Sequence, residues 1–163
     1  MAQTKVVVED VVVYSYDGHG DRVLNKVPME ILVDDDYAID GVPMPTPSEA
    51  YIEVSPMTLD AKRMPGNGQM VAPYLGTAFN VTWKYKWLNA AQFKRIYDTY
   101  ILGTISKKDM FHTVKTLDTN TGESRELTIY TQDKLGQAPY MIKNGVRYFR
   151  DVTLSMVDRA GEV

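Results

Sequence analysis

The clearest pattern in the chain is a strict alternation of apolar and polar residues from Phe79 to Trp87. A period of two is the period of a β-strand that turns one face to a core and the other to solvent or a partner. The pattern therefore predicts a half-buried strand, and its inward side chains are those of Phe79, Val81, Trp83, Tyr85 and Trp87.

The period changes to that of an α-helix directly after this strand. Apolar residues then recur at helical spacing, at Phe93, Ile96, Tyr97, Tyr100 and Ile101. Asn89 is a favourable N-cap, Gln92 can complete a capping box, and Gly103 is expected to end the helix in the left-handed conformation. The sequence predicts one amphipathic helix, at about residues 90–102, that lies against a sheet.

The first part of the chain is rich in valine and predicts a long hairpin. Its strands are expected from Thr4 to Tyr16 and from Arg22 to Val33, with a glycine-containing turn between them. An apolar first strand of this kind would aggregate if its edge stayed open. We therefore expect a single domain spanning residues 1–163, in which the N-terminal hairpin, residues 1–36, makes contacts between subunits.

The segment after the hairpin is predicted to be a connection. Asp34-Asp35-Asp36 and the prolines of residues 43–47 disfavour a regular strand. Tyr51 to Ser55 is a candidate strand, and Lys62 to Gly68 is predicted to be a flexible loop of the kind that often carries contacts.

The last third of the chain returns to strands. They are expected from Met110 to Leu117, from Arg125 to Thr131 and from Val146 to Val157, and Asn144-Gly145 is a strong signal for a two-residue hairpin. Short links of this type favour antiparallel pairing. The fold class is therefore mostly β, a β-sandwich or partly closed antiparallel barrel with one flanking amphipathic helix.

Composition narrows the function. The net charge is −3 and the 18 Lys and Arg residues are scattered, which disfavours specific nucleic-acid binding. The absence of cysteine excludes disulfides and thiolate metal sites. No apolar run reaches the roughly 20 residues that cross a bilayer, and no signal peptide is recognisable, so we expect a soluble protein without a membrane partner.

No motif in the sequence points to catalysis or to a metal. His19 and His112 lack the spacing of a zinc site, and the acidic turns at Asp17 and Asp21 and at residues 34–36 do not fit a calcium loop. The G-x-S-x-G and phosphate-loop motifs are absent, although a Ser/His/Asp arrangement is spatial and escapes a motif search. We expect no catalytic residue, no cofactor-binding residue and no metal ligand, and hence a protein that is not an enzyme.

The aromatic residues leave a second class of function open, which is ligand binding. A ligand-binding β module for carbohydrate or peptide would use those aromatics that stay exposed among Trp83, Tyr85, Trp87 and Tyr140. The alternation favours core packing instead, because it gathers the aromatic side chains on one face and the lysines on the other.

The order of elements along the chain carries a resemblance. Its pieces are Ile39 to Pro43, Arg63 to Gly68, Phe79 to Trp87, Ala90 to Leu102, Asp118 to Gly122, and Tyr148 to Val157. In this order they resemble the small structural proteins of bacteriophage tails, over roughly residues 39–158. The resemblance implies a β-sandwich or barrel with a flanking helix that assembles into rings, as in tail tube, tail-terminator and baseplate-hub proteins, with no cofactor and no catalytic residues.

Taken together, these observations predict a homo-oligomeric ring that contacts other phage tail proteins. The protein would be made in the host bacterial cytoplasm and reside in the tail of the virion. The expected contact segments are Lys5 to Tyr14 and Arg63 to Gly68, because exposed strand edges and glycine-rich loops suit contacts that close a ring. The candidate interface residues are Val7, Val11, Val13, Arg63, Met64 and Asn67.

Overall fold

The structure is a computed structural model, and it describes residues 4–58, 62–63, 65–72, 74–131 and 138–158. Its strands are β1 (Thr4–Tyr16), β2 (Arg22–Ile39), β3 (Val42–Met44), β4 (Glu49–Thr58), β5 (Lys62–Arg63), β6 (Met70–Val71), β7 (Tyr74–Asn89), β8 (Phe111–Leu117), β9 (Ser124–Thr131), β10 (Met141–Lys143) and β11 (Val146–Asp158). The helix consists of α1 (Ala90–Ile96), a π-helical segment η1 (Tyr97–Leu102) and α2 (Gly103–Lys107). The mostly β class is confirmed.

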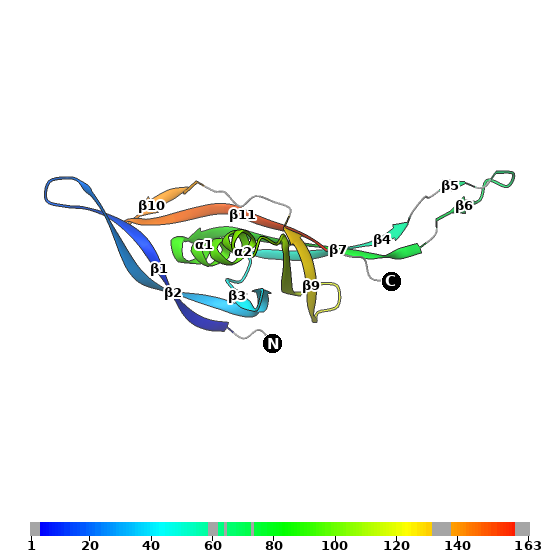
Figure 1. Ribbon diagram of the computed structural model, residues 1–163, viewed down its shortest axis with the longest axis horizontal. Helices are drawn as coiled ribbons and strands as arrows, with labels where there is room; N and C mark the ends of the chain where they lie inside the picture. The colour runs from blue at the N-terminus through cyan, green and yellow to red at the C-terminus, as the bar shows by residue number, and fades with distance from the viewer. Residues whose placement is uncertain (1–3, 59–61, 64, 73, 132–137, 159–163) are drawn as a thin grey trace.

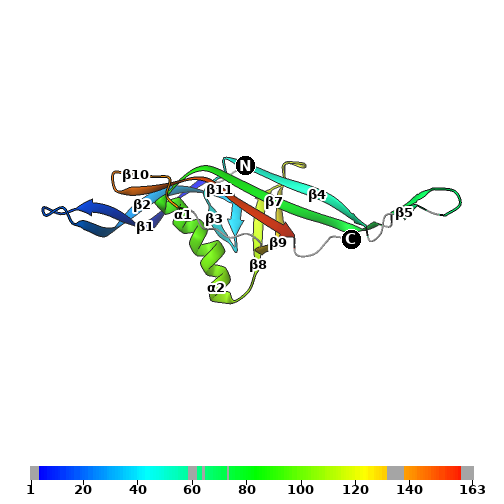
Figure 2. The same cartoon turned by 90° about the horizontal axis from the view of Figure 1, so that it is seen from above.

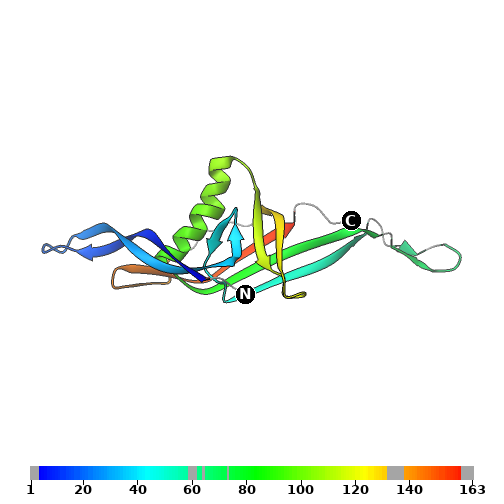
Figure 3. The same cartoon turned by 90° about the horizontal axis from the view of Figure 1, so that it is seen from below.

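Nine of the described strands form one antiparallel sheet that curls into a half-barrel. Its order is β1-β2-β8-β9-β11-β7-β4, with β3 beside β2 and β10 beside β11. The molecule is long and narrow, because the β1–β2 hairpin projects from one end and the β4–β7 hairpin, with the small β5–β6 ribbon, projects from the other (Figures 1 and 3). The helix stands against the curled middle of the sheet (Figure 2).

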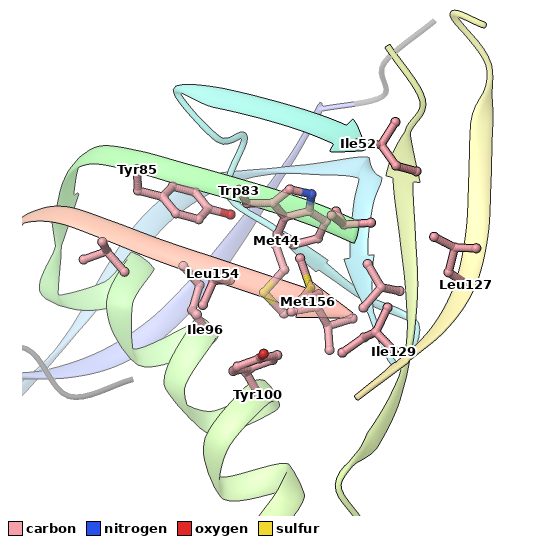
Figure 4. Packing of buried hydrophobic residues seen from close by; sticks show 14 of the residues in the cluster. Met44, Ile52, Trp83, Tyr85, Ile96, Tyr100, Leu127, Ile129, Leu154 and Met156 are labelled. Atoms are coloured by element: carbon pink, nitrogen blue, oxygen red, sulfur yellow. The ribbon is translucent and has the colours of Figure 1, made fainter. Parts of the chain in front are cut away.

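The core lies where the helix meets β7 and β11. Figure 4 shows Trp83 and Tyr85 of β7 with Ile96 and Tyr100 of the helix, all of them buried. The polar atoms of the two strand aromatics are satisfied: Trp83 Nε1 donates to Thr116 Oγ1 at 3.0 Å, and the Tyr85 hydroxyl donates to the Pro45 carbonyl at 2.8 Å. Large aromatic side chains can therefore be buried here without an unpaired donor.

The start of the helix is confirmed and its end is not. Asn89 and Gln92 form the expected capping box. The helix passes through Gly103, which has helical φ, and ends four residues later, before Lys108, whose φ is +54°. Glycine permits a left-handed stop but does not impose one, and the added turn is held by contacts of Thr104 with β8 that are described below.

Two further expectations about strands are wrong. Residues 34–36 belong to β2, which runs on to Ile39 through an irregularity between Asp34 and Ala38. A buried aspartate is tolerated there because the Asp34 carboxylate accepts hydrogen bonds from the Asp36 amide and the Thr46 hydroxyl. The proline-rich segment supplies the short strand β3, whose outer side lacks a partner in the described sheet, a position that proline allows.

The alternation along β7 also breaks before its end. Burial alternates as expected up to Tyr85, but Trp87 is 45% exposed and its neighbour Leu88 is buried instead. On the paired strand β11, Asp151 has a φ of +55° and makes no ladder pair. This local irregularity turns Leu88 and its partner Phe149 toward the helix and leaves Trp87 on the outside.

The β10–β11 turn holds the N-terminal hairpin. Asn144 and Gly145 both have positive φ, as a two-residue hairpin turn requires. The Tyr14 amide of β1 donates to the Gly145 carbonyl at 2.9 Å, so the turn lies directly against β1. A Cβ at position 145 would overlap the Tyr14 carbonyl oxygen, and only glycine fits.

We predict that Gly145→Ala lowers the free energy of unfolding by about 2–4 kcal/mol, since it adds a steric overlap to the cost of a left-handed alanine. Gly122→Ala is the matched control, because Gly122 has the same sign of φ, at +79°, and open space around its Cβ position. The control should lose only about 1 kcal/mol. Urea unfolding of both variants measures the difference in the free energy of unfolding. Equal losses would show that the contact of the turn with β1 does not contribute to stability.

Candidate functional site

The β1–β2 hairpin has two faces that differ sharply in what covers them. The cross-strand register pairs Val7 with Ile31 on one face, and Val6 with Leu32 on the other. Directly opposed residues share a face, so the register sorts the valines of β1 into two rows.

The inner row is covered by the chain itself. Val11 is 1% exposed and packs with Ile31 and Val33 against Ala90 and Ala91 at the start of α1. Small residues at this point of the helix let the strands approach closely. The base of the hairpin is therefore part of the core.

An ion-pair cluster fixes the inner row in place. Arg95 of α1 contacts Glu9 of β1 at 3.0 Å and donates through Nε to the Pro43 carbonyl at 2.6 Å. Lys94 also contacts Glu9, at 3.4 Å, and Asp98, at 3.0 Å. The side chains of Glu9 and Arg95 are only about one-sixth exposed, so this pair is largely shielded from water and salt.

The outer row is not covered by any residue that the structure describes. Val6, Val8 and Leu32 are 60%, 57% and 59% exposed. Asp10 and Glu30 flank them on the same face, because Glu30 pairs with Val8 and Asp10 pairs with Pro28. We call these five residues the outer patch. Toward the tip the same face carries Lys26, so the acidic character is confined to the base of the hairpin.

Both ends of the curled sheet are open within the described residues. β1 pairs only with β2, and β4 pairs only with β7. A strand at a sheet edge presents unpaired N–H and C=O groups to any strand that approaches. The outer patch therefore lies beside one of two long open edges.

A second group of side chains, mostly aromatic and apolar with two basic residues beside them, lies on β7, β10 and β11. We call it the aromatic cluster: Trp87 of β7, Tyr140, Met141 and Lys143 on β10 or just before it, and Tyr148 and Arg150 of β11. The rings of Trp87 and Tyr140 meet edge to face at a centroid distance of 5.3 Å, and the Arg150 guanidinium stacks on Tyr140 at 4.1 Å. Trp87, Met141, Lys143 and Tyr148 line an open cavity of about 300 Å³.

A chain of polar groups ties the end of the helix to β8. His112 Nδ1 contacts Asp40 Oδ2 at 2.6 Å, and its Nε2 contacts Thr104 Oγ1 at 2.6 Å. The Thr104 hydroxyl also donates to the Tyr100 carbonyl at 2.7 Å. The order carboxylate, imidazole, hydroxyl is that of a hydrolase triad, but the His112 side chain is 0% exposed and the hydroxyl proton is already taken by a backbone carbonyl.

The acidic segments form no cluster suited to a metal ion. Among the described residues, no group of three or more His, Cys, Asp and Glu side chains could hold one. Asp17 instead accepts backbone hydrogen bonds from His19 and Asp21 within the β1–β2 turn. Asp35 contacts Lys5 at 3.3 Å, which ties the two strands of the hairpin together.

The candidate interface residues are scattered. Val7, Val11 and Val13 lie in the inner row, so the valines that face outward are their neighbours Val6 and Val8. Asn67 lies in the exposed turn between β5 and β6, where it accepts from the Gln69 amide at 2.9 Å. Arg63 belongs to β5, at the opposite end of the molecule from the β1–β2 hairpin (Figure 1), and Met64 lies outside the described residues.

The sequence predicted neither the aromatic cluster as a whole nor the polar chain, although Trp87 and Tyr140 were among the four candidate aromatics for ligand binding. Trp87 was expected to face the core, and only the irregularity opposite Asp151 exposes it. His112 was named only as a residue without the spacing of a zinc site. Its partner Asp40 is distant in sequence and its partner Thr104 lies on the helix, so no local motif joins the three residues. A signal for the cluster does exist in the consecutive apolar residues 140–142 beside the Asn144-Gly145 turn.

Comparisons with known proteins give no information about the function of this chain. No protein-family model, no curated protein and no solved structure matches the chain. Within the part of the chain that is described, none of the helices has the length and apolar character needed to cross a membrane.

The polar chain makes stability depend on pH. Burial alone would raise the pKa of Asp40, but hydrogen bonds from Lys107, His112 and the Thr113 amide outweigh it and lower the pKa below its ordinary value of 3.8. A carboxyl whose pKa is depressed by folding stabilises the fold above its unfolded pKa, and this contribution is lost as the pH falls through the folded value.

We predict that Asp40→Asn destabilises the protein at pH 7 and that the difference from wild type shrinks below about pH 4. Asparagine suits the test because it tolerates the positive φ of this position, +51°. Urea unfolding of both proteins from pH 7 to pH 3 measures the effect. A stability difference that does not change with pH would contradict it.

Proposed function

We propose that this protein is a structural subunit of a phage or prophage tail, which acts by assembling with copies of itself into a ring or tube and by contacting neighbouring tail proteins. The resemblance in the order of elements suggests the class. The physical support is independent of it and comes from the surface of the hairpin and the edges of the sheet.

The observation that carries the proposal is the outer patch. A monomer in water gains nothing by presenting Val6, Val8 and Leu32 together on one exposed face. The inner row and the Glu9–Arg95 pair hold the other face of the hairpin against the helix, so the outer patch is held in a fixed position. A rigid, preformed apolar surface costs little conformational entropy when it is covered by a partner.

The two open edges add to this support. β1 and β4 are different strands at opposite ends of one sheet. A contact between two unlike surfaces of identical subunits is heterologous, and repeated contacts of this kind form a closed ring or an open helical filament. A ring or tube is therefore the assembly that such a sheet favours.

We propose a structural role, rather than a catalytic one, for the chain of Asp40, His112 and Thr104. Its groups bind each other and the backbone, and its imidazole is enclosed by the protein. In this role the chain fastens the last helical turn to β8 and keeps the half-barrel closed around the helix.

The alternative function, a carbohydrate- or peptide-binding module, has less support. Two of its four candidate aromatics, Trp83 and Tyr85, are core residues. Trp87 and Tyr140 are exposed, but Met141 next to them adds an exposed, flexible aliphatic side chain to the surface. Such a composition is more typical of a contact between proteins.

We predict that the wild-type protein forms species larger than a monomer as its concentration rises. Val8→Lys should raise the concentration needed for assembly at least about tenfold, because it replaces an apolar side chain of the covered surface by a charged one that must lose its water. Absolute mass from light scattering after size exclusion, measured over a concentration series, gives both results. The unfolding midpoint of the variant should stay near that of wild type, since the side chain is already 57% exposed.

Ile105→Lys is the matched control. Ile105 is an equally exposed aliphatic residue, at 63%, but it lies on α2 and away from the hairpin. This variant should assemble like wild type. A wild-type protein that stays monomeric at every concentration would overturn the proposed function.

A further inference from the structure

We propose that the outer patch of one copy docks on the aromatic cluster of a second copy, so that the unit of assembly is a head-to-tail contact between these two surfaces. This inference rests on the proposed self-assembly and adds to it the surface that receives the hairpin. It makes the exposed Trp87 and Tyr140 part of a binding site for another copy of the same chain.

The composition of the aromatic cluster fits a contact between proteins. Tryptophan, tyrosine, methionine and arginine are the residues enriched at such interfaces, and the first two with arginine dominate their binding energy. Here the edge-to-face contact with Trp87 and the stacked Arg150 hold the Tyr140 ring from two sides. A site that is ordered before binding loses less entropy on binding.

The cavity of the cluster matches the side chains that the outer patch offers. Its volume of about 300 Å³ is walled by Trp87, Met141 and Tyr148. One or two aliphatic side chains such as those of Val8 and Leu32 would fill a space of this size, and no described residue of their own chain covers their cross-strand row. Burial of apolar groups in an apolar cavity drives such a contact.

The charges of the two surfaces are complementary. The outer patch carries Asp10 and Glu30, both exposed, and the aromatic cluster carries Lys143 at the rim of its cavity. Arg150 beside it is already paired with Asp151 at 3.1 Å, so Lys143 is the cation that supplies the complementarity. Opposite charges around an apolar centre select the orientation of a contact and exclude the pairing of like surfaces. Neither surface is complementary to itself, so a symmetric dimer through either one is disfavoured.

The positions of the two surfaces permit a chain of contacts. Helix α1 contacts both β1 and β11, and Figure 1 shows it between the β1–β2 hairpin on one side and β10–β11 on the other. The inner row faces the helix, so the outer patch faces away from it. On the other side Leu88 and Phe149 face the helix, and Trp87 and Arg150 face away.

The two surfaces of one copy therefore point in opposite directions and cannot meet within a chain, whereas each can meet the other surface of a neighbour. A stable contact buries about 1,200–2,000 Å² in total, so the patch and the cluster would form its centre and adjacent strand surface its rim. Repetition covers both surfaces of every copy except at the two ends of an unclosed assembly, where one surface of the terminal copy stays open.

Site-directed cross-linking tests the contact, because the chain contains no cysteine of its own. A Val8→Cys protein mixed with a Met141→Cys protein should form mixed disulfide dimers under mild oxidation. Val54→Cys replaces Val8→Cys in the control mixture, since Val54 is also an exposed valine but lies on β4. Equal or faster cross-linking of the control would overturn the proposal.

Charge reversal provides a second, independent test. Glu30→Lys and Lys143→Glu should each raise the concentration needed for assembly about tenfold or more, because each places like charges in contact. A chain that carries both changes should recover most of the assembly. Glu123→Lys, the same change on the exposed β8–β9 turn, should have no effect.

The outcomes separate this inference from the function on which it rests. If wild type assembles but neither the cross-link nor the charge rescue appears, the contact lies elsewhere and only this inference fails. If wild type remains a monomer, the proposed function itself fails. Quenching of Trp87 emission by an added oligosaccharide, with no change of mass, would assign the cluster to a sugar ligand and also overturn the contact.

Discussion

The structure depends on how the β1–β2 hairpin is held. A two-stranded ribbon is marginally stable in water on its own, so it depends on contacts with the rest of the chain. The inner row on Ala90 and Ala91, the shielded pair of Glu9 and Arg95, and the β10–β11 turn at Tyr14 together make it a rigid extension of the core. The same attachment leaves the outer row of valines without cover.

Rigid attachment of one face and exposure of the other are linked by register. Side chains alternate along a strand, so a valine-rich sequence that supplies an inner row also supplies an outer row. A chain that needed only the inner row could place polar residues at Val6, Val8 and Leu32 at no cost to its core. Apolar residues at all three positions therefore favour a second covering surface, and we propose that a further copy provides it.

Much of the fold could be predicted from the sequence because its signals are local. The period of two in β7, the capping box at Asn89 and the Asn144-Gly145 turn each depend on residues close together in the chain, and all three appear in the structure. The failures arise from contacts distant in sequence. Trp87 turns outward because of Asp151 on the paired strand, and the helix continues past Gly103, where Thr104 meets His112. The aromatic cluster joins three strands, so the apolar residues 140–142 signal only one part of it.

Imaging of the assembled wild-type protein by cryo-electron microscopy tests the central claim most directly, because it shows which surfaces meet. We predict rings or tubes in which the outer patch of each copy is covered by the aromatic cluster of its neighbour. Single elongated particles at high concentration, or an assembly in which Val6 and Val8 face solvent, would contradict the account.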